Sequence, residues 1–308
     1  MNTRVPLAKM LTFGLLPGCL KKAIYRLKGN KIGRHVKLHL GAVVSGKKRF
    51  IIGDYTEIGY FTSISGQNVS IGKRCNIRSA VIINVPNIVI GNEVTISETA
   101  IIRAGHPAKD SELIVDDLVH IFPHATIDAS RRVHLGEECA VGPRCSIFTH
   151  GSYKNILDGY PVTYGDVNIG KRVELTYNVF VAPGVTVGDD AVIAYGSYVN
   201  KNIPSGVLAA GCPAVVKRTK EQFAPACSEE EKQAILNQIV EDFKEYASFC
   251  NLRLDPESVK VIGIQEVILN GVYHYDLVHH RCTLPDTVLS KELRRFFSRY
   301  GIRFKVEA

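Results

Sequence analysis

The sequence predicts a mainly β protein: a parallel β-helix with an N-terminal helical cap and a small C-terminal α/β domain. Three observations predict it, namely a six-residue repeat of aliphatic side chains, a basic amphipathic segment before the repeat and a change of periodicity after it. A period of six matches neither the value of about 3.6 typical of a helix nor the value of about 2 typical of a flat strand. Short repeats of this kind indicate a coil in which each face is one hexad with one inward aliphatic residue.

Residues 1–30 are expected to form the cap. Apolar side chains alternate there with lysine and arginine, and Pro17 divides the segment into two short helical pieces. Residues 1–50 contain twelve Lys or Arg and no Asp or Glu, which indicates an anionic neighbour. Two roles remain open and are compatible: closing the end of the β-helix, or lying on an anionic membrane. The apolar run is too short to span a bilayer, and Lys9 and Pro17 argue against a signal peptide.

Residues 31–218 carry the hexads and are assigned to the β-helix. Glycine follows many in-phase aliphatics and is expected at corners, where positive φ or close approach to the next coil is needed. Residues 103–118 and 149–168 lack the six-residue repeat of aliphatic residues and are predicted to be long functional loops. The in-phase residues include Ile52, Ile58, Ile64, Ile71, Ile77, Ile90, Ile96, Leu135, Val141, Ile147, Ile169, Leu175, Val181, Val187, Ile193 and Val199.

Residues 226–308 are predicted to form a separate α-β-β-α-β domain of unknown role. Ser228 and Glu231 match a capping box for a helix that ends near Cys250. Asn270-Gly271 is a strong hairpin signal between two predicted strands, residues 259–269 and 272–282. A helix over residues 290–300 and a strand over 302–306 complete the domain.

The sequence predicts neither a metal site nor a disulfide framework. The eight cysteines form no C-x-x-C pair and are expected to be small buried residues in a reducing cytoplasm. His274, His279, His280 and Cys282 invite a metal interpretation, but adjacent residues 279 and 280 would point to opposite faces of a strand.

From Asp166 onward, the sequence resembles the C-terminal coils of hexapeptide-repeat acyltransferases, particularly the sugar and polysaccharide O-acetyltransferases related to the maltose and galactoside acetyltransferases. The most specific part runs from APGVTVG at residues 182–188 to GCPA at residues 211–214. The resemblance covers roughly residues 31–218. It implies a left-handed β-helix assembled as a homotrimer, with acetyl-CoA in the groove between two subunits. A three-fold assembly through one repeated interface is also physically reasonable.

The resemblance implies that His150, in the segment IFTHGSY, is the general base, a role that suits a side chain titrating near neutral pH. His106, His120 and His124 are weaker candidates. Asp128 lies about one coil before His150 and is expected to bind the acceptor or to orient His150. A backbone N–H near Asn168 or Gly170 is expected to stabilise the oxyanion.

The resemblance also implies the donor site. Backbone groups around Gly196, Ser197 and Gly211 are expected to line the pantetheine arm, and Lys217 and Arg218 to face the phosphates. Tyr195 and Val215 depart from the family pattern. Tyr195 stands where a small residue is usual, so it is expected to narrow or re-route the thioester channel. Val215 stands where several members carry a base, and Lys217 is a candidate substitute.

The function predicted in this way is transfer of an acetyl group from acetyl-CoA to a sugar hydroxyl in cell-surface polysaccharide synthesis. The protein is expected in the cytoplasm, with possible peripheral membrane contact through residues 1–30 and no nucleic-acid partner. Three alternatives remain open. They are an N-acetyltransferase of a nucleotide-linked amino sugar or a small xenobiotic, a γ-type carbonic anhydrase, which His120 and His124 fit poorly, and a non-catalytic scaffold.

Overall fold

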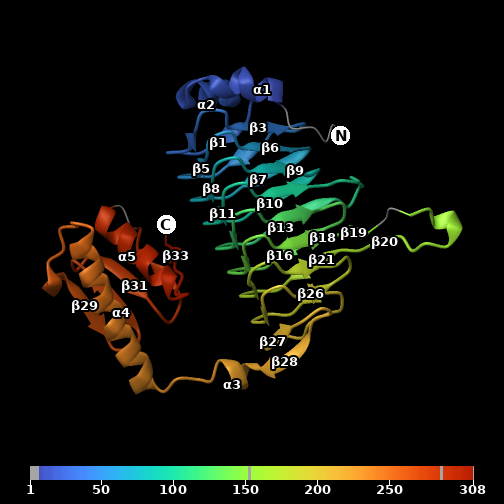
Figure 1. Cartoon of the computed structure of the whole chain (residues 1–308). Helices are drawn as coiled ribbons and strands as arrows, with labels where there is room; N and C mark the ends of the chain where they lie inside the picture. The colour runs from blue at the N-terminus through green and yellow to red at the C-terminus, as the bar shows by residue number, and fades with distance from the viewer. Residues whose placement is uncertain (1–6, 152–153, 285–286, 308) are drawn as a thin grey trace. The chain divides into compact units, whose positions relative to one another are not determined.

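The computed structural model describes residues 7–151, 154–284 and 287–307. Residues 1–6 of the predicted cap and Ser152-Tyr153 of the histidine segment therefore lie outside the described residues. The chain divides into two compact units between Phe223 and Ala224. The first unit is a stack of β-coils with short helices across one end (Figure 1).

Three parallel sheets form the faces of the stack, and each coil contributes one strand to each face. The first sheet contains β1 (Lys31–Ile32), β4 (Ile51–Ile52), β7 (Asn68–Ile71), β10 (Asn87–Ile90), β13 (Glu112–Val115), β16 (Val133–Leu135), β21 (Val167–Ile169) and β24 (Thr186–Val187). The second contains β2 (Lys37–Leu38), β5 (Glu57–Ile58), β8 (Asn76–Ile77), β11 (Thr95–Ile96), β14 (His120–Ile121), β17 (Ala140–Val141), β22 (Glu174–Leu175), β25 (Val192–Ile193), β27 (Val207–Ala210) and β28 (Val215–Thr219). The third contains β3 (Val43–Gly46), β6 (Ser63–Gly66), β9 (Ile82–Asn84), β12 (Ile101–Arg103), β15 (Thr126–Asp128), β18 (Ser146–Phe148), β23 (Phe180–Val181) and β26 (Tyr198–Val199).

The hexad aliphatics occupy the interior of the stack, as the period predicts. Ile52, Ile58 and Ile64, one from each face of a coil, are all at most 1% exposed. Each such side chain contributes about 1.5–3 kcal/mol when it leaves water. Because every coil repeats the arrangement, one continuous core runs through the stack.

The corner glycines are required because the backbone of the next coil approaches them closely, and not because they adopt a positive φ. A Cβ on Gly53 would lie 2.5 Å from the carbonyl carbon of Gly72, its counterpart in the next coil. The left-handed backbone instead falls two residues later, at Tyr55 (φ 60°) and Arg74 (φ 56°). A residue with a side chain is strained in that conformation. The free energy gained when the coils stack must therefore offset the backbone strain at each of these corners.

The N-terminal cap closes the first coil. Helices α1 (Leu7–Leu11) and α2 (Gly18–Leu27) flank the 3-10 helix η1 (Phe13–Leu15) and lie across the end of the stack (Figure 1). Lys21 is fully buried, and its ammonium group donates to the carbonyls of Gly14 (3.1 Å), His39 (2.6 Å) and Ala42 (3.4 Å). The hydroxyl of Tyr25 exchanges hydrogen bonds with the backbone of Val44, both at 2.9 Å. The cap therefore satisfies backbone groups that no preceding coil pairs.

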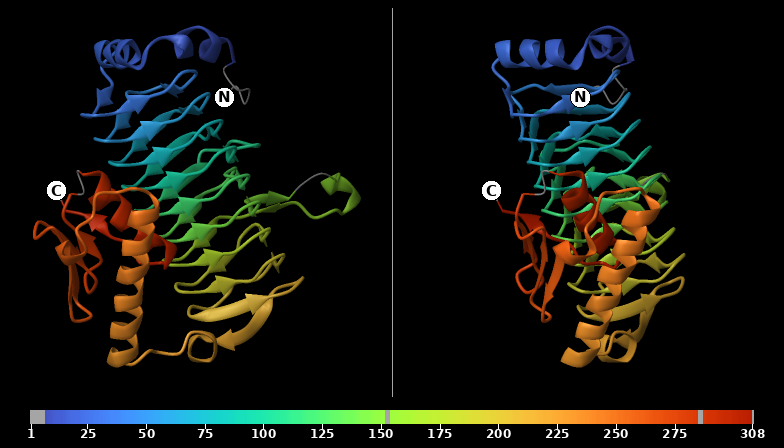
Figure 2. Two further views of the ribbon diagram at one scale, coloured as in Figure 1. Left: turned by 60° about the vertical axis from the view of Figure 1, so that its left-hand side comes forward. Right: turned by 90° about the vertical axis from the view of Figure 1, so that its left-hand side faces the viewer.

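The two predicted loops differ from expectation. Only residues 104–111 of the first leave the coil, because residues 112–115 form β13. The second leaves the stack as an arm (Figure 2). Strands β19 (His150–Gly151) and β20 (Thr163–Tyr164) pair antiparallel at its base, and η2 (Ile156–Asp158) lies near its tip. At the other end of the stack, β28 runs antiparallel to β27 and is followed by α3 (Lys220–Phe223).

The second unit has its own core around Phe243, Tyr275 and Phe297. Ser228 and Glu231 form the expected capping box at the start of the first helix. Each of the two predicted strands before the second helix is divided by a turn, so the sheet has five strands rather than three. Its elements are α4 (Glu229–Phe249), η3 (Pro256–Ser258), β29 (Val259–Ile262), β30 (Glu266–Leu269), β31 (Tyr273–Asp276), β32 (Arg281–Cys282), α5 (Val288–Arg299) and β33 (Lys305–Val306).

Two side-chain expectations need correction. Residues 277–280 form a turn, so the strand argument against a metal at His279 and His280 was wrong. Their imidazoles bond instead to separate partners, Asp276 and the Arg303 carbonyl. Four cysteines are exposed rather than buried, and these are Cys19, Cys212, Cys227 and Cys250.

Candidate active site

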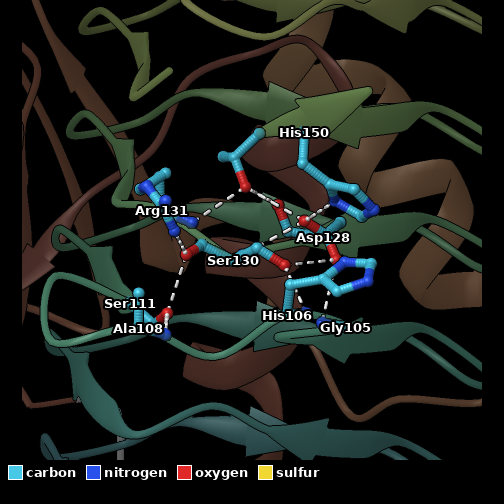
Figure 3. Close-up of polar contacts among 9 residues, drawn as sticks. Gly105, His106, Ala108, Ser111, Asp128, Ser130, Arg131 and His150 are labelled. Atoms are coloured by element: carbon cyan, nitrogen blue, oxygen red, sulfur yellow. Dashed lines mark hydrogen bonds and ion pairs between the residues drawn. The ribbon is translucent and has the colours of Figure 1, made fainter. Parts of the chain in front are cut away.

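His150 and Asp128 lie together where the arm leaves the third sheet (Figure 3). The Nδ1 atom of His150 lies 2.8 Å from Oδ1 of Asp128. An ionised carboxylate only accepts hydrogen bonds, so Nδ1 carries the proton and Nε2 of the neutral ring is left with a lone pair. The side chain of His150 is 17% exposed. The arrangement therefore presents a partly accessible, oriented base.

Asp128 is held by donors from three neighbouring segments. Oδ1 accepts from the backbone N–H of Ser130 (3.1 Å) and the hydroxyl of Thr149 (3.0 Å) as well as from His150. Oδ2 accepts from the backbone N–H of Gly105 (3.0 Å) and the hydroxyl of Ser130 (3.1 Å). Burial raises the pKa of Asp128, but these hydrogen bonds outweigh it and lower the pKa below its ordinary value.

These contacts do not support the predicted role of Asp128 in acceptor binding. A carboxylate offers about four lone-pair sites, and donors within the chain already occupy them. The residue is 7% exposed. Its geometry fits the other expected role, which is to orient His150.

Aromatic and basic side chains surround the pair. The ring of His106 meets that of His150 edge to face, with centroids 4.6 Å apart, and the Tyr164 ring stacks at 6.0 Å. Arg131 lies 4.3 Å above Tyr164. Next to the pair is a pocket whose lining includes Asp128, Gly105, Arg103, Thr126 and Phe148.

An aromatic stripe on the outside of the third sheet leads from His150 toward the predicted donor site. Phe148 stacks on Phe180 with centroids 5.4 Å apart, and Phe180 meets Tyr198 at 5.5 Å. Tyr198 directly follows Ser197. Sequence analysis missed this stripe, although Phe180 and Tyr198 each precede an in-phase valine and so must share an outward register position.

The structure brings part of the predicted donor site together. The Ser197 hydroxyl donates to Ala194 (2.6 Å) and accepts from the backbone N–H of Gly211 (3.1 Å), so it bridges two chain segments. Ser197 is therefore a buried support rather than a contact surface. Gly196 is exposed at φ 68°, and a Cβ there would meet no atom within 4 Å.

The remaining predicted donor residues are exposed. Tyr195 is 69% exposed and stacks on Tyr177 with centroids 5.4 Å apart. Lys217 and Arg218 lie on β28, the last strand of the second sheet, and both are exposed. Exposed cations and an open glycine are compatible with a phosphate-bearing chain on this surface.

The expected oxyanion donors at Asn168 and Gly170 are already used. The N–H of Asn168 donates to Val185 (3.1 Å), and that of Gly170 donates to Val187 (2.8 Å). Both bonds join successive coils, so neither N–H is available to a developing oxyanion.

The described ranges hold no group of three His, Cys, Asp or Glu side chains placed to bind a metal ion. Nor, within residues 7–151, 154–284 and 287–307, does any helix have the length and apolar character needed to cross a bilayer.

No protein-family model matches the chain. Individual relatives do match, and several of them are named acetyltransferases. The chain is 28% identical over 131 residues to the *Escherichia coli* protein named as colanic acid biosynthesis acetyltransferase WcaF, covering 42% of this chain and 69% of the relative. It is 34% identical over 95 residues to *Escherichia coli* galactoside O-acetyltransferase, and the match covers 30% of this chain and 47% of that one. Against *Lactococcus lactis* galactoside O-acetyltransferase it is 48% identical over 88 residues, 28% of this chain and 42% of the relative. The chain thus spans less than half of either galactoside enzyme.

Among solved structures, the fold resembles the *Francisella novicida* UDP-N-acetylglucosamine acyltransferase, with a TM-score of 0.51 and 19% identity over 71% of this chain and 82% of that one. This match concerns the fold alone. The fold is thus a left-handed β-helix of the acyltransferase type, and the names of the sequence relatives support assignment to the hexapeptide-repeat acyltransferases. The protein is thus an acyltransferase enzyme, as its C-terminal coils predicted.

Proposed function

We propose that this protein transfers an acetyl group from acetyl-CoA to a sugar hydroxyl during synthesis of a cell-surface polysaccharide. The observation that carries the proposal is the His150–Asp128 pair, whose Nδ1–Oδ1 distance of 2.8 Å orients a base at the edge of a pocket. The galactoside and colanic acid names of the relatives support a sugar-containing acceptor.

In this proposal, Nε2 of His150 accepts the proton of the acceptor hydroxyl as its oxygen attacks. Asp128 is a positioning residue: it fixes the ring and stabilises the imidazolium that forms, as a triad carboxylate does. Acetyl-CoA supplies the thioester carbonyl. The proton then passes from His150 to the departing thiolate, so the protein returns to its starting state.

The donor is assigned to the surface that holds Tyr195, Gly196 and Gly211, with Ser197 as its internal support. Lys217 and Arg218 are assigned to the phosphates because both are exposed on one edge strand. The aromatic stripe Phe148–Phe180–Tyr198 joins this surface to His150 and supports one continuous site. The proposal further includes a homotrimer and a cytoplasmic protein whose residues 1–30 touch an anionic membrane surface.

The decisive experiment is calorimetric titration with acetyl-CoA, followed by thiol release in the presence of candidate sugars. Micromolar binding with sugar-dependent release supports the proposal. Release only with amino sugars as acceptors would instead indicate N-acetyl transfer. Binding by Tyr195→Ala but not by the wild type would mean that this ring closes the donor channel, and absence of binding in both would favour a scaffold.

A further inference from the structure

A second pocket lies at the capped end of the β-helix, far along the chain from His150 and made from other segments. Its cations come from three places: Lys9 from α1, Lys28 from the end of α2, and Lys47, Lys48 and Arg49 from the turn after β3. The turn is fixed to the next coil, since the backbone N–H groups of Lys47 and Lys48 donate to Gly66 (3.2 Å) and Gln67 (3.0 Å).

These cations have no acidic counterpart nearby in the chain. The first acidic residue of the sequence is Asp54, and within the described residues no carboxylate forms an ion pair with any of the five. Lys9 is half-buried and bonds to the hydroxyl of Ser45 at 2.5 Å. Burial, and next the charge of Lys28, lower the pKa of Lys9. A bound anion would relieve this repulsion.

Gly29 lies between two residues of the pocket lining, Lys28 and Asn30. Its φ of 79° favours glycine, and the Arg49 side chain comes close to it, since Nε would lie 2.8 Å from a Cβ at that position. The exposed Arg49 side chain therefore lies near Gly29, the residue that follows Lys28 at the end of α2. Guanidinium and ammonium groups gathered in this way suit phosphate oxygens.

Apolar side chains are exposed on the same two helices and the 3-10 turn between them. Leu27 is 87% exposed, and Leu11, Leu15 and Leu20 are each about half exposed. Leu20 and Leu27 are seven residues apart and so share one side of α2. The hydrogen bonds that hold the cap on the first coil come from other side chains, among them Lys21, Lys22 and Tyr25. Exposed leucines beside a cationic pocket are typical of a surface that meets a lipid bilayer.

We propose that the pocket formed by Lys9, Lys28, Lys47, Lys48 and Arg49 binds phosphate groups of anionic phospholipids while the exposed leucines enter the bilayer interface. The capped end of the β-helix then docks on the membrane. This site assignment deepens the membrane contact of residues 1–30 in the proposed function and rests on it, but it shares no residue with the acetyl-transfer machinery.

The test is co-flotation of the full-length protein with vesicles of phosphatidylcholine alone or mixed with phosphatidylglycerol. We expect binding only to the mixed vesicles, weakened by salt. The triple variant Lys47→Gln/Lys48→Gln/Arg49→Gln should bind less by roughly fivefold per charge, on the order of a hundredfold in all. Its circular dichroism and thermal midpoint should match the wild type, because all three side chains are exposed.

The matched control, Lys201→Gln/Lys232→Gln/Lys260→Gln, removes three exposed charges elsewhere and should bind as the wild type does. If both triple variants lost vesicle binding equally, the binding would depend on net charge alone, and the proposed pocket site would be overturned. Unchanged binding by the pocket variant would overturn it as well. Binding of inorganic pyrophosphate without any binding to vesicles would indicate a site for free phosphate and would reject the membrane.

A second variant tests the apolar part. Leu20→Ser/Leu27→Ser should weaken flotation at high salt, where charge is screened, more than at low salt. Flotation at high salt that equals the wild type would show that the leucines remain outside the bilayer.

Discussion

At the scale of single residues, the candidate site depends on the oriented ring of His150. His150→Ala should lower turnover by roughly two to four decades, the usual contribution of a general base, and leave acetyl-CoA affinity intact. Thiol release and calorimetry on the same preparation separate the two effects. Unchanged turnover would remove His150 from the mechanism.

Asp128→Asn should lower kcat by roughly 10²- to 10⁴-fold with little change in the KM for acetyl-CoA, because an amide can donate to Nδ1 and impose the wrong tautomer. An equal loss in kcat from Thr149→Val, which keeps the carboxylate, would point to a general loosening of the loop instead.

Asp128 should also affect stability at acid pH. Its folded pKa is lowered, since the hydrogen bonds to it outweigh the opposing effect of burial. The contribution of Asp128 to the free energy of unfolding is therefore complete above the unfolded pKa of about 3.9. It is lost as the pH falls through the pKa of Asp128 in the folded protein. The thermal midpoint of the wild type should fall toward that of Asp128→Asn below about pH 4. A difference in thermal midpoint between the wild type and Asp128→Asn that stayed constant down to the lowest pH would contradict this prediction.

The sequence could predict His150, which opens a loop in a family-like segment, and it could place Asp128 about one coil earlier. It could not predict that Gly105, Ser130 and Thr149 saturate the carboxylate. The contacts from Gly105 and Thr149 depend on the register in which β15 pairs with β12 and β18, which brings together residues more than twenty positions apart. Ser130 is only two residues from Asp128, and its contacts depend on the local turn after β15. In the first sheet, the pairing of β21 with β24 likewise places the N–H groups of Asn168 and Gly170 in bonds between coils.

At the scale of elements, the cap depends on the buried Lys21. Lys21→Met should lower the free energy of unfolding by about 1–3 kcal/mol, because buried carbonyls of Gly14, His39 and Ala42 lose their donor. Urea denaturation measures the loss. Lys31→Met, at an exposed lysine of β1, is the control, and an equal change in both would mean that the buried bonds contribute nothing.

The hexad period predicted the inward face of the coils well, because one side-chain position repeats through every sheet. It predicted the interruptions less well. Residues 112–115 were assigned to a loop, yet Leu113 and Val115 are buried in β13. An eight-residue excursion shifts the phase of the hexads without ending them, and a fixed period cannot follow such a shift. The turn at residues 277–280 was missed because its own Val278, His279 and His280 fit a strand pattern.

At the scale of the molecule, the proposed homotrimer is directly measurable. Light scattering after size exclusion should give about three times the mass of the 34.0 kDa chain. The exposed apolar residues of the arm, such as Ile156 and Leu157, offer surface for such contacts. A monomer at micromolar concentration would contradict the assembly.

The helices over the first coil and the reversed strand β28 after the last have one more consequence. A stack of parallel coils is a template at both ends, since any further strand of the same kind could continue its ladders. Here α2 covers one end and β28 turns back along the edge at the other, so the length of the stack is set within the chain. Removing either terminator would leave an edge on which copies could add end to end, and a discrete enzyme would become the subunit of a growing fibre.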